Sequence, residues 1–583
     1  MTGRDTGAAN LRFARHLLAG LHAAGVGHVV LCPGSRSTPL ALAAAEHPGL
    51  VHTVHLDERS AAFFALGHAK ATGRAVAIAC TSGTAAANFL PAVAEAHHAR
   101  VPLVVLTADR PPELRAWGAA QTLDQRGLYL GFTRFAEDAP CPGERDGEDR
   151  YAAALARRAV VAATGPAPGP VHLNLPFREP LVPAEITPWT PPPHGDPTHA
   201  DLAGGATDDA VGDRLKQFAR GVLLFGPDVH DPALPEAASA LALSLGWPLL
   251  ADPGSGLRAG PSADRALVAG ADLLLRDAAT AAALAPDLVV RFGGHPTSAP
   301  MNAWLARHGM AEVWLVDPAD GFRDPLHRAG RTFRADARRF CEAALRATGH
   351  GHDRPSAWLA AWKQADAVAR AAAHGRLQAG APFMGPQLVQ ALWQALPADA
   401  TLYVANSMPV RELDAFAGPR AAPLRVLVNR GVNGIDGLVS CALGAAVGLG
   451  KPTVLYCGDL AFLHDLGGLL AARQLGAHLT VVVANDHGGG IFEYLPVARA
   501  VPRELFEQVW ATPQAADLGA LAAAAGWNAT RAESAEAFAD ALAGALRGGL
   551  HVIEVPIDRA ANTALHAALV AAVDEALAGE RPA

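Results

Sequence analysis

The chain is poor in cysteine and has no long apolar segment free of charge. Its 583 residues include six cysteines, and no two of them form a CxxC pair. Several stand in apolar, strand-like runs, which indicates buried free thiols in a reducing compartment rather than disulfides or a zinc site. The sequence has no uncharged run of eighteen apolar residues, and its N-terminal segment lacks the apolar region and cleavage site of a signal peptide. We therefore expect a cytoplasmic protein.

Signatures of several common protein classes are also missing. No GxGxxG turn follows a strand between residues 205 and 350, which argues against a dinucleotide there. Ser35, Ser82 and Ser407 lack a GxSxG context, so a serine nucleophile is not expected. The 24 histidines match no zinc spacing, and the pair His97-His98 is interpreted as structural or solvated. A net charge of −8 gives no reason to expect nucleic acid or an anionic membrane as a partner.

What the sequence does contain is a repeated alternation of short apolar strands with helical segments. This rhythm predicts an α/β fold with doubly wound parallel sheets. A proline- and glycine-rich linker at 181–209 and a second break at 350–355 separate the parts of the chain. A chain of this length is expected to form two to four domains. The predicted domains are residues 1–185, 205–350 and 370–583.

The positions of individual elements follow from the same patterns. The expected strands include 28–32, 50–56, 75–80 and 103–106 in the first domain, 288–292 and 313–316 in the second, and 401–405, 453–457 and 479–484 in the third. The α/β pattern of the second domain begins with the run at 221–227. The expected helices include 10–24, 61–70, 85–98, one that follows Asp459 and ends near Leu475, and 561–577.

Two polar turns follow neighbouring strands of the third domain. Asp459 follows the first of these strands, and Asn485 and Asp486 follow the second, just before the glycines at 488–490. Parallel strands end on the same edge of a sheet, where open α/β folds bind ligands. Oxygen donors beside helix N-termini and bare glycine backbone suit a divalent cation that accompanies a diphosphate. Asp and Asn also favour turns for structural reasons, so the residue types alone leave both interpretations open.

Glu58 and four arginines stand at the same kind of edge in their domains. Glu58 is either a first-turn helix residue favoured by the helix dipole or a carboxylate with a raised pKa that exchanges a proton with a ligand nitrogen. Any one of the arginines could be solvated or structural. Together they suggest a substrate with more than one carboxylate, which arginine binds bidentately. The four are Arg36, Arg110, Arg411 and Arg430.

Seven segments carry a resemblance to a known family. They are CPGSRSTP in 32–48, HLDERS and SGT in 55–96, ADRPPEL in 102–125, NSMPVRELD (406–414), NRGVNGIDG (429–437), GDLAFLHDL (458–466) and GGGIFEYLP (488–496). Taken together they resemble the thiamine diphosphate enzymes and, more narrowly, the 2-succinyl-5-enolpyruvyl-6-hydroxy-3-cyclohexene-1-carboxylate synthases of menaquinone biosynthesis. The segments run through the first and third domains in the family's order.

The resemblance implies a pyrimidine-binding, a middle and a diphosphate-binding domain, and thiamine diphosphate and Mg²⁺ (or Mn²⁺) as cofactors. It implies a transferase that decarboxylates 2-oxoglutarate and adds the resulting succinyl semialdehyde carbanion to isochorismate by 1,4-addition, releasing CO₂. Glu58, supplied by the partner subunit, would protonate the aminopyrimidine ring of the cofactor. The active unit would then be at least a homodimer, and the family suggests a homotetramer. Neither nucleic acid nor a membrane is implied as a partner.

The resemblance also assigns site residues. Asp459, Asp486 and the carbonyl of Gly488 would hold the metal, with Asn485 as the fallback ligand, and Ile435 would be the apolar wedge that bends the cofactor. The cofactor-binding set is Glu58, Ser82, Gly83, Asn406, Ser407, Gly434, Ile435, Asp459, Leu460, Gly488, Gly489, Ile491 and Phe492. The residues that would position the substrates are Ser35, Arg36, Arg110, Gln121, Ser407, Arg411 and Arg430, with Ile491, Phe492 and Leu495 as an apolar wall.

Three departures from the family pattern bear on these roles. Asp486 stands where the family usually has asparagine, and Ala120 stands where many members have asparagine. The loop at 294–300 has no basic side chain where some members present one to the substrate. Two alternatives stay open: another thiamine diphosphate carboligase, such as an acetolactate synthase, or a binding protein that retains the cofactor fold without turnover.

Overall fold

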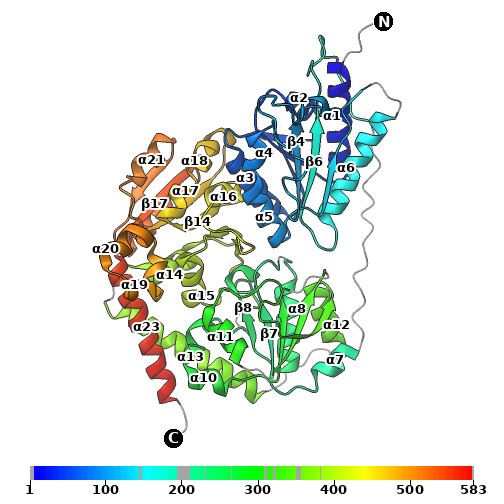
Figure 1. Cartoon of the computed structure of the whole chain (residues 1–583). Coiled ribbons are helices and arrows are strands. Elements are labelled where there is room, and N and C mark those ends of the chain that lie inside the picture. The colour runs from blue at the N-terminus through cyan, green and yellow to red at the C-terminus, as the bar shows by residue number, and fades with distance from the viewer. Residues whose placement is uncertain are drawn as a thin grey trace. The chain divides into compact units, whose positions relative to one another are not determined.

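A computed structural model describes residues 6–143, 147–192, 210–229, 231–263, 265–307, 311–319, 323–348, 356–380 and 382–580. Within these residues the strands form three parallel sheets, each flanked by helices (Figure 1). The predicted α/β class with parallel sheets is therefore confirmed. The second break, around 350–355, lies outside the described residues, as does most of the predicted linker. None of the helices in the described part is long and apolar enough to cross a membrane.

The first sheet has the strand order β2-β1-β3-β4-β6-β5. Its strands are β1 (His28–Leu31), β2 (Val51–Val54), β3 (Val76–Cys80), β4 (Leu103–Asp109), β5 (Phe135–Asp138) and β6 (Pro170–Pro176). Its helices are α1 (Thr6–Ala23), α2 (Thr38–Glu46), α3 (Glu58–Thr72), α4 (Thr84–Asn88), α5 (Leu90–Ala99), the short η1 (Pro112–Leu114) and α6 (Glu148–Thr164). Apolar residues of α1, α2 and α6 pack on one face of this sheet, and α3 and α5 lie on the other side in Figure 1.

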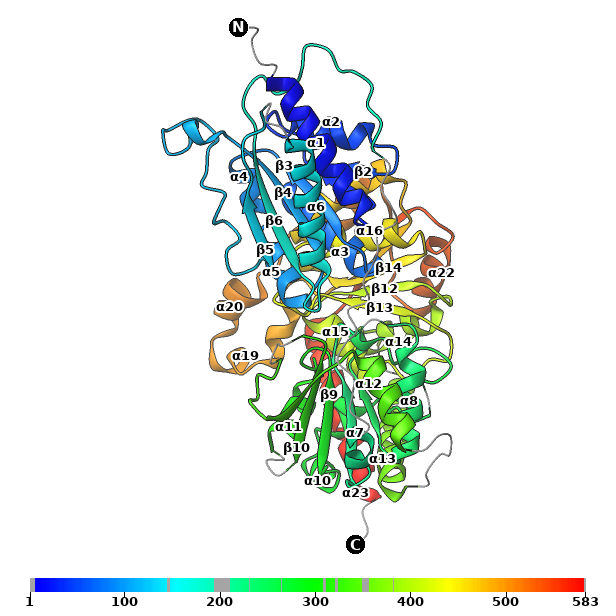
Figure 2. The ribbon, with the colours of Figure 1, turned by 90° about the vertical axis from the view of Figure 1, so that its right-hand side faces the viewer.

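The second sheet has the order β11-β10-β9-β7-β8. Its strands are β7 (Gly221–Phe225), β8 (Leu249–Ala251), β9 (Leu288–Phe292), β10 (Glu312–Asp317) and β11 (Ala329–Arg334). The helices are α7 (Ala210–Leu215), α8 (Leu234–Leu245), η2 (Pro253–Ser255), α9 (Ala271–Leu274), α10 (Ala278–Ala283), α11 (Ala299–Arg307), α12 (Ala337–Thr348) and α13 (Ala357–Gln378). Figure 2 shows α8 and α12 side by side, and their apolar residues share one core with this sheet.

The third sheet has the order β13-β12-β14-β15-β17-β16. Its strands are β12 (Thr401–Val404), β13 (Arg425–Val428), β14 (Thr453–Gly458), β15 (Leu479–Asn485), β16 (Asn528–Arg531) and β17 (Leu550–Pro556). The helices before β15 are α14 (Gly385–Ala395), α15 (Met408–Phe416), α16 (Leu438–Leu449), α17 (Asp459–His464), α18 (Leu466–Ala472) and η3 (Arg473–Leu475). Those after it are η4 (Gly490–Tyr494), α19 (Val497–Ala500), α20 (Arg503–Phe506), η5 (Glu507–Ala511), α21 (Leu518–Ala524), α22 (Ala535–Ala545) and α23 (Arg559–Gly579).

Residue contacts divide the chain into two compact units that do not follow the three sheets one for one. The first unit comprises Met1–Asp201, Gly431–Gly450 and His464–Leu479, and the second comprises Leu202–Arg430, Lys451–Leu463 and Thr480–Ala583. In the first unit α16 packs closely on α3. The helices approach so closely at Gly67 that a Cβ there would lie 2.0 Å from the carbonyl oxygen of Cys441. In the second unit apolar residues of the second and third sheets form one core. The domain boundaries predicted from the sequence remain predictions.

Two predicted helices are wrong in their continuity. The helix expected at 85–98 is two helices that meet at Phe89, because Pro91 in the first turn of α5 has no N–H to continue the preceding helix. The helix expected after Asp459 is interrupted at Asp465, between α17 and α18. The buried carboxylate of Asp465 accepts hydrogen bonds from the backbone N–H and the hydroxyl of Ser440, and these bonds stabilise the interruption.

One predicted strand end is also wrong. The strand expected at 103–106 continues to Asp109, so Thr107 and Asp109 lie inside β4 rather than after it. The continuation pairs with β6, where Thr107 donates a 3.0 Å hydrogen bond to Asn174. Strand β6, with α6 and β5, was not predicted at all.

Candidate cofactor and substrate site

Asp459 and Asp486 form a pair of neighbouring carboxylates at the ends of β14 and β15. Asp459 begins α17 directly after the strand, is 3% exposed, and accepts backbone hydrogen bonds from Leu460 and Gly488. Burial raises the pKa of Asp459 to about 6, although these hydrogen bonds act in the opposite direction. Burial and the charge of Asp459 raise the pKa of Asp486 to about 8. Two carboxylates that repel one another in a poorly hydrated place would be stabilised by a cation between them.

The hydrogen bonding of Asp486 leaves one of its carboxylate oxygens available to bind such a cation. Among the described residues its buried Oδ1 has no hydrogen-bond partner. A buried, unsatisfied carboxylate oxygen costs free energy unless a metal or donor meets it. No group of three or more His, Cys, Asp or Glu side chains suited to a metal occurs in the described residues. A metal here would depend on two carboxylates together with backbone carbonyls.

The glycines that follow Asp486 are required by close packing. Gly488 has φ +135°, and a Cβ on it would lie 2.1 Å from the carbonyl oxygen of Ala511. A Cβ on Gly490 would lie 1.8 Å from Oδ2 of Asp486. The turn can therefore bring bare backbone beside the two carboxylates, as a diphosphate-binding turn needs.

Asn485 is held by other partners. Its amide donates to Glu554 at 2.8 Å, and its Oδ1 accepts the backbone N–H of His487 at 3.1 Å. Both polar ends of this side chain are therefore used within the fold. The contrast with Asp486, whose Oδ1 is unpartnered among the described residues, favours Asp486 over Asn485 as a ligand.

A buried polar network behind this turn was missed by the sequence reasoning. Glu412 is 3% exposed and accepts hydrogen bonds from Tyr456 at 2.8 Å and Asn562 at 3.3 Å, with a ring nitrogen of His566 also at 3.3 Å. Its charge contributes to the raised pKa of Asp486. Glu412 lies inside the NSMPVRELD segment, but only its burial distinguishes it from an ordinary helical glutamate.

The second unit also brings together four other predicted site residues. Arg430 donates to Asn406 at 2.7 Å, and Arg411 donates to the carbonyl oxygen of Ser407 at 2.6 Å. Ser407 has φ +72°, a conformation that a non-glycine residue adopts rarely and that often marks a functional position. Burial and then the charge of Arg430 lower the pKa of Arg411. The charge of one guanidinium group therefore acts on the other.

A second arginine pair lies in the first unit. Arg36 is 4% exposed and donates to the carbonyl of Phe177 at 2.9 Å and to Glu179 at 2.8 Å. Arg110 donates to the hydroxyl of Ser82 at 3.3 Å, and burial followed by the charge of Arg36 lowers the pKa of Arg110. The two arginines are thus neighbours at the end of the first sheet.

Gln121 and Gly83 complete this group. The amide of Gln121 donates to the Ser82 carbonyl at 3.0 Å, and the Ser82 hydroxyl donates back to the Gln121 carbonyl at 3.1 Å. Gly83 has φ +87° and donates its N–H to Gln125 at 2.9 Å. Ser35, by contrast, is exposed in the turn after β1, where its carbonyl accepts the hydroxyl of Thr38 at 2.7 Å. The structure brings Ser82, Gly83, Arg110 and Gln121 together, with Arg36 beside them.

Glu58 is the first residue of α3, as the structural interpretation of its position predicts. The helix is capped by Asp57, whose carboxylate accepts the N–H of Arg59 at 2.9 Å. Glu58 is half-buried, and its charge contributes, after burial, to raised pKa values of Cys32 and Cys80. The carboxylate therefore lies near the ends of β1 and β3, at the edge where a ligand would bind.

The predicted apolar contacts are divided between the units. Gly434 and Ile435 belong to the first unit, where Ile435 is half-buried in the loop after β13. Leu460, Gly489, Ile491, Phe492 and Leu495 belong to the second unit, where Ile491 and Phe492 are half-buried in η4 and Leu495 is 44% exposed.

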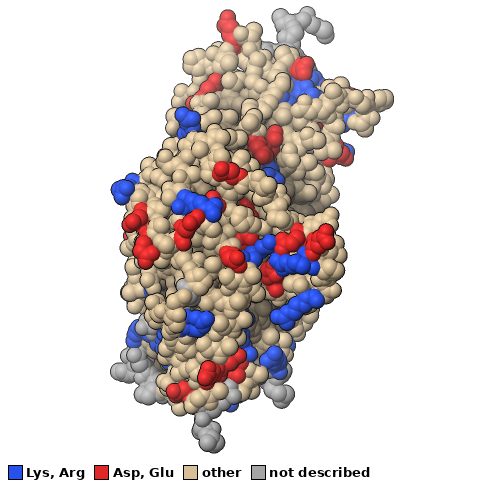
Figure 3. Space-filling view, turned by 90° about the vertical axis from the view of Figure 1, so that its left-hand side faces the viewer, with Lys and Arg blue, Asp and Glu red and all other residues tan. Residues whose placement is uncertain are grey.

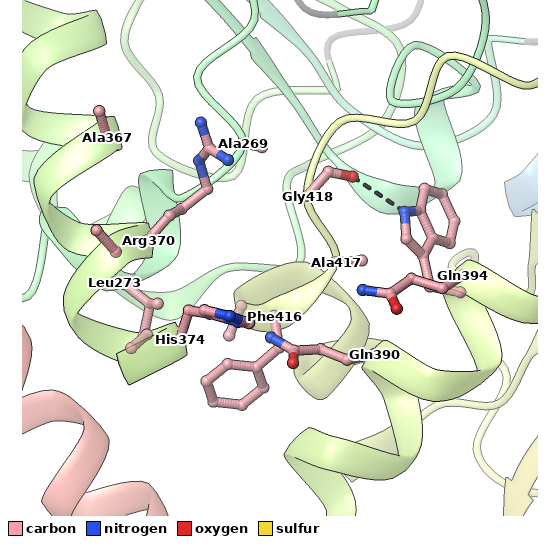
Figure 4. A pocket seen from close by; sticks show the side chains of 14 residues that line it. Ala269, Leu273, Ala367, Arg370, His374, Gln390, Gln394, Phe416, Ala417 and Gly418 are labelled. Atoms are coloured by element: carbon pink, nitrogen blue, oxygen red, sulfur yellow. Dashed lines mark hydrogen bonds between the residues drawn. The ribbon is translucent and has the colours of Figure 1, made fainter. Parts of the chain in front are cut away.

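A cavity of about 390 Å³ lies elsewhere in the second unit (Figure 4). Arg370 and His374 of α13 and Gln390 and Gln394 of α14 border it, over apolar side chains that include Phe416. None of the predicted site residues lines this cavity.

Comparisons with known proteins cover almost the whole chain. Three family models match: the N-terminal TPP binding domain of thiamine pyrophosphate enzymes at residues 11–128, the middle domain at 211–404, and the C-terminal TPP binding domain at 416–555. Relatives described as 2-succinyl-5-enolpyruvyl-6-hydroxy-3-cyclohexene-1-carboxylate synthase include one from Chloroflexus aurantiacus, 45% identical over 96% of this chain and 95% of its own. Another, from Geobacillus kaustophilus, is 44% identical over 95% and 96% of the two chains. One from Myxococcus xanthus is 41% identical over 98% of both chains.

The chain belongs to the 2-succinyl-5-enolpyruvyl-6-hydroxy-3-cyclohexene-1-carboxylate synthase family. This synthase family and the matching domains make it a thiamine diphosphate-dependent transferase of menaquinone biosynthesis, as the sequence segments predicted. The N-terminal model contains Glu58 and the Arg36–Arg110 pair, and the C-terminal model contains Asp459 and Asp486. Asn406, Ser407 and Arg411 lie between the middle and C-terminal matches.

Proposed function

We propose that this synthase decarboxylates 2-oxoglutarate and adds the remaining fragment to isochorismate by 1,4-addition, releasing CO₂. Identity of 41% or more to synthases of this name over nearly the whole chain supports the reaction. The observation that carries the choice of substrates is an arginine pair in each unit, Arg36 with Arg110 and Arg411 with Arg430. Adjacent guanidinium groups suit substrates that bear more than one carboxylate.

Asp459 and Asp486, with the carbonyl of Gly488, would hold Mg²⁺ or Mn²⁺ on the diphosphate. The unpartnered Oδ1 of Asp486 and the glycine turn support this ligand set, and the engaged amide of Asn485 argues against the fallback ligand. Thiamine diphosphate, when bound, supplies the electron sink for loss of CO₂. Gly434, Ile435, Leu460, Gly489, Ile491 and Phe492 would exclude water around it and fix its orientation.

Glu58 would hold a proton at the aminopyrimidine nitrogen of a cofactor bound by the partner subunit. Ser82, Gly83 and Asn406 would contact the cofactor, and Ser35, Gln121 and Ser407 would assist the arginines with the substrate carboxylates. A homodimer is the minimum unit under this assignment, and a homotetramer agrees with the family. The cytoplasmic location stays a prediction.

The experiment that tests the catalytic proposal is a comparison of wild type with Glu58→Gln. CO₂ release from 2-oxoglutarate should fall by about 100-fold or more, in line with loss of general acid–base catalysis, while thiamine diphosphate still binds. A wild-type protein that binds the cofactor but releases no CO₂ would favour a cofactor-binding protein without turnover.

A further inference from the structure

Glu95 of α5 is a buried carboxylate that the assigned site does not use. It is 0% exposed, and it accepts the backbone N–H groups of three consecutive residues. The distances are 3.0 Å to Gly431, 2.6 Å to Val432 and 2.8 Å to Asn433. Successive N–H groups that converge on one anion form a nest, and hydrogen bonds to a charged acceptor are among the stronger ones. All of these residues belong to the first unit.

The loop that Glu95 holds has little freedom at this end. A Cβ on Gly431 would lie 2.6 Å from Oε2 of Glu95 and 3.0 Å from the backbone nitrogen of Ala99, so a side chain here would displace the carboxylate. The amide of Asn433 then donates to Oδ1 and the carbonyl of Asp436 at 2.7 and 3.1 Å. These bonds close a short loop whose outer residues are Gly434 and Ile435.

The other end of the loop is fixed on α3. Gly437 has φ +67°, and a Cβ on it would lie 2.0 Å from the ring of Phe63. The span from Gly431 to Gly437 is therefore hydrogen-bonded to a carboxylate on α5 at its start and packed closely against an aromatic ring on α3 at its end. Ile435 lies between these two anchors and is half-buried.

We propose that Glu95 is a positioning residue that sets the place of Ile435 against the thiamine ring system. This inference rests on the proposed function, in which Gly434 and Ile435 contact the cofactor. The metal and diphosphate ligands Asp459 and Asp486 follow other strands, β14 and β15, and do not depend on this carboxylate. Substitution of Glu95 should therefore change the alignment of the bound cofactor more than the affinity with which the cofactor binds.

The test compares Glu95→Gln and Asn433→Ala with wild type and with Glu148→Gln. Glu148 is a matched control, because it is a buried glutamate of the same unit that also accepts a backbone N–H, from Gly143 at 2.9 Å. Glu95→Gln and Asn433→Ala, the two loop variants, both remove hydrogen bonds that hold the loop. For them we expect kcat for CO₂ release from 2-oxoglutarate to fall by about tenfold or more, the scale of one hydrogen bond to a charged group. The KM for thiamine diphosphate should change by less than about threefold, because uniform binding is retained.

A second readout does not require turnover. At saturating thiamine diphosphate and Mg²⁺, the near-ultraviolet circular dichroism of the bound cofactor should differ from wild type in both loop variants and not in Glu148→Gln. Unchanged kcat and unchanged dichroism in the loop variants would overturn the role of Glu95 while leaving the proposed function intact. An equal loss in Glu148→Gln would also overturn it, since the effect would then be a general one of removing a buried carboxylate. If the wild type itself released no CO₂, the proposed function would fail, and the dichroism comparison would still decide whether Glu95 aligns the cofactor.

Discussion

At the residue scale, the proposed metal ligands Asp459 and Asp486 are neighbouring carboxylates whose surroundings differ sharply. Asp459 accepts backbone hydrogen bonds, whereas Oδ1 of Asp486 has no partner among the described residues. Their placement at strand ends could be predicted from the sequence, because polar residues after buried parallel strands meet at one edge. The roles of Glu95 and Glu412 could not, because both stand in helical segments and only the packing of distant residues shows that they are buried and hydrogen-bonded.

The first prediction concerns the metal ligand. Asp486→Ala should weaken Mg²⁺-dependent thiamine diphosphate binding by at least about 10- to 100-fold. That is the loss of metal affinity seen when a residue that only supports a metal ligand is substituted, and loss of a ligand itself should cost no less. Asn485→Ala should leave the Mg²⁺ affinity nearly unchanged and cost about 1 kcal/mol of stability, because its amide serves Glu554 and the backbone of His487. Mg²⁺ titrations of cofactor binding and thermal unfolding of the two variants measure these effects. The opposite ranking of Mg²⁺ affinities would make Asn485 the ligand.

At the scale of elements, strands and most helices could be predicted where the pattern is local. The failures occur where distant side chains intervene. Strand β4 extends to Asp109 because β6 pairs with it, and the helix after Asp459 breaks at Asp465 because Ser440 and Ser60 bond its carboxylate. Strand β6 and the two serines are all distant in sequence from the ends that they determine, so hydrophobic periodicity alone could not locate these ends.

A buried histidine group joins β1, the end of β2 and α3. Burial, followed by the charges of the neighbouring histidines, lowers the pKa of His28 to about 3, and burial lowers the pKa values of His55 and His68 to about 4. The ring of His55 packs 4.6 Å from that of Phe64, and neither ring nitrogen has a hydrogen-bond partner among the described residues. These side chains are therefore held neutral in the folded first unit.

The second prediction is an acid sensitivity of this region. Histidines of the unfolded chain titrate near pH 6.5, so between that value and about pH 4 the unfolded state binds more protons than the folded state. The stabilisation from neutral histidines is complete above pH 6.5 and is lost as the pH falls through 4. His55→Phe should move the acid unfolding midpoint, followed by circular dichroism, to lower pH, whereas His374→Gln, at an exposed position of α13, should not. An unchanged midpoint in His55→Phe would exclude this histidine as a source of the sensitivity.

At the scale of the whole molecule, the three α/β parts could be predicted but not how their residues group. The segments Gly431–Gly450 and His464–Leu479 lie between strands of the third sheet, yet they belong to the first compact unit. One cause of this grouping is the close approach of α16 to α3 at Gly67 and Gly444, and no local sequence pattern predicts that contact. The face in Figure 3 carries acidic and basic side chains interspersed among uncharged ones.

The third prediction tests the assembly. If Glu58 serves a cofactor held by the Asp459 of another subunit, homodimers of Glu58→Gln and of Asp459→Ala should each be inactive. Subunit exchange between them should restore activity, because each mixed dimer contains one site with both native side chains. The assay is CO₂ release before and after mixing. No recovery, with exchange verified by a mass-tagged subunit, would mean that both residues act within one chain.

The central claim is that this synthase uses 2-oxoglutarate and isochorismate, and a substrate comparison tests it most directly. Purified protein with thiamine diphosphate and Mg²⁺ is offered 2-oxoglutarate or pyruvate, each with and without isochorismate, and CO₂ and the adduct are measured. We predict CO₂ release from 2-oxoglutarate and an adduct that requires isochorismate, with little reaction of pyruvate, which lacks the second carboxylate for the arginine pairs. Consumption of pyruvate without consumption of 2-oxoglutarate would contradict the assignment and place the chain with carboligases of the acetolactate synthase kind.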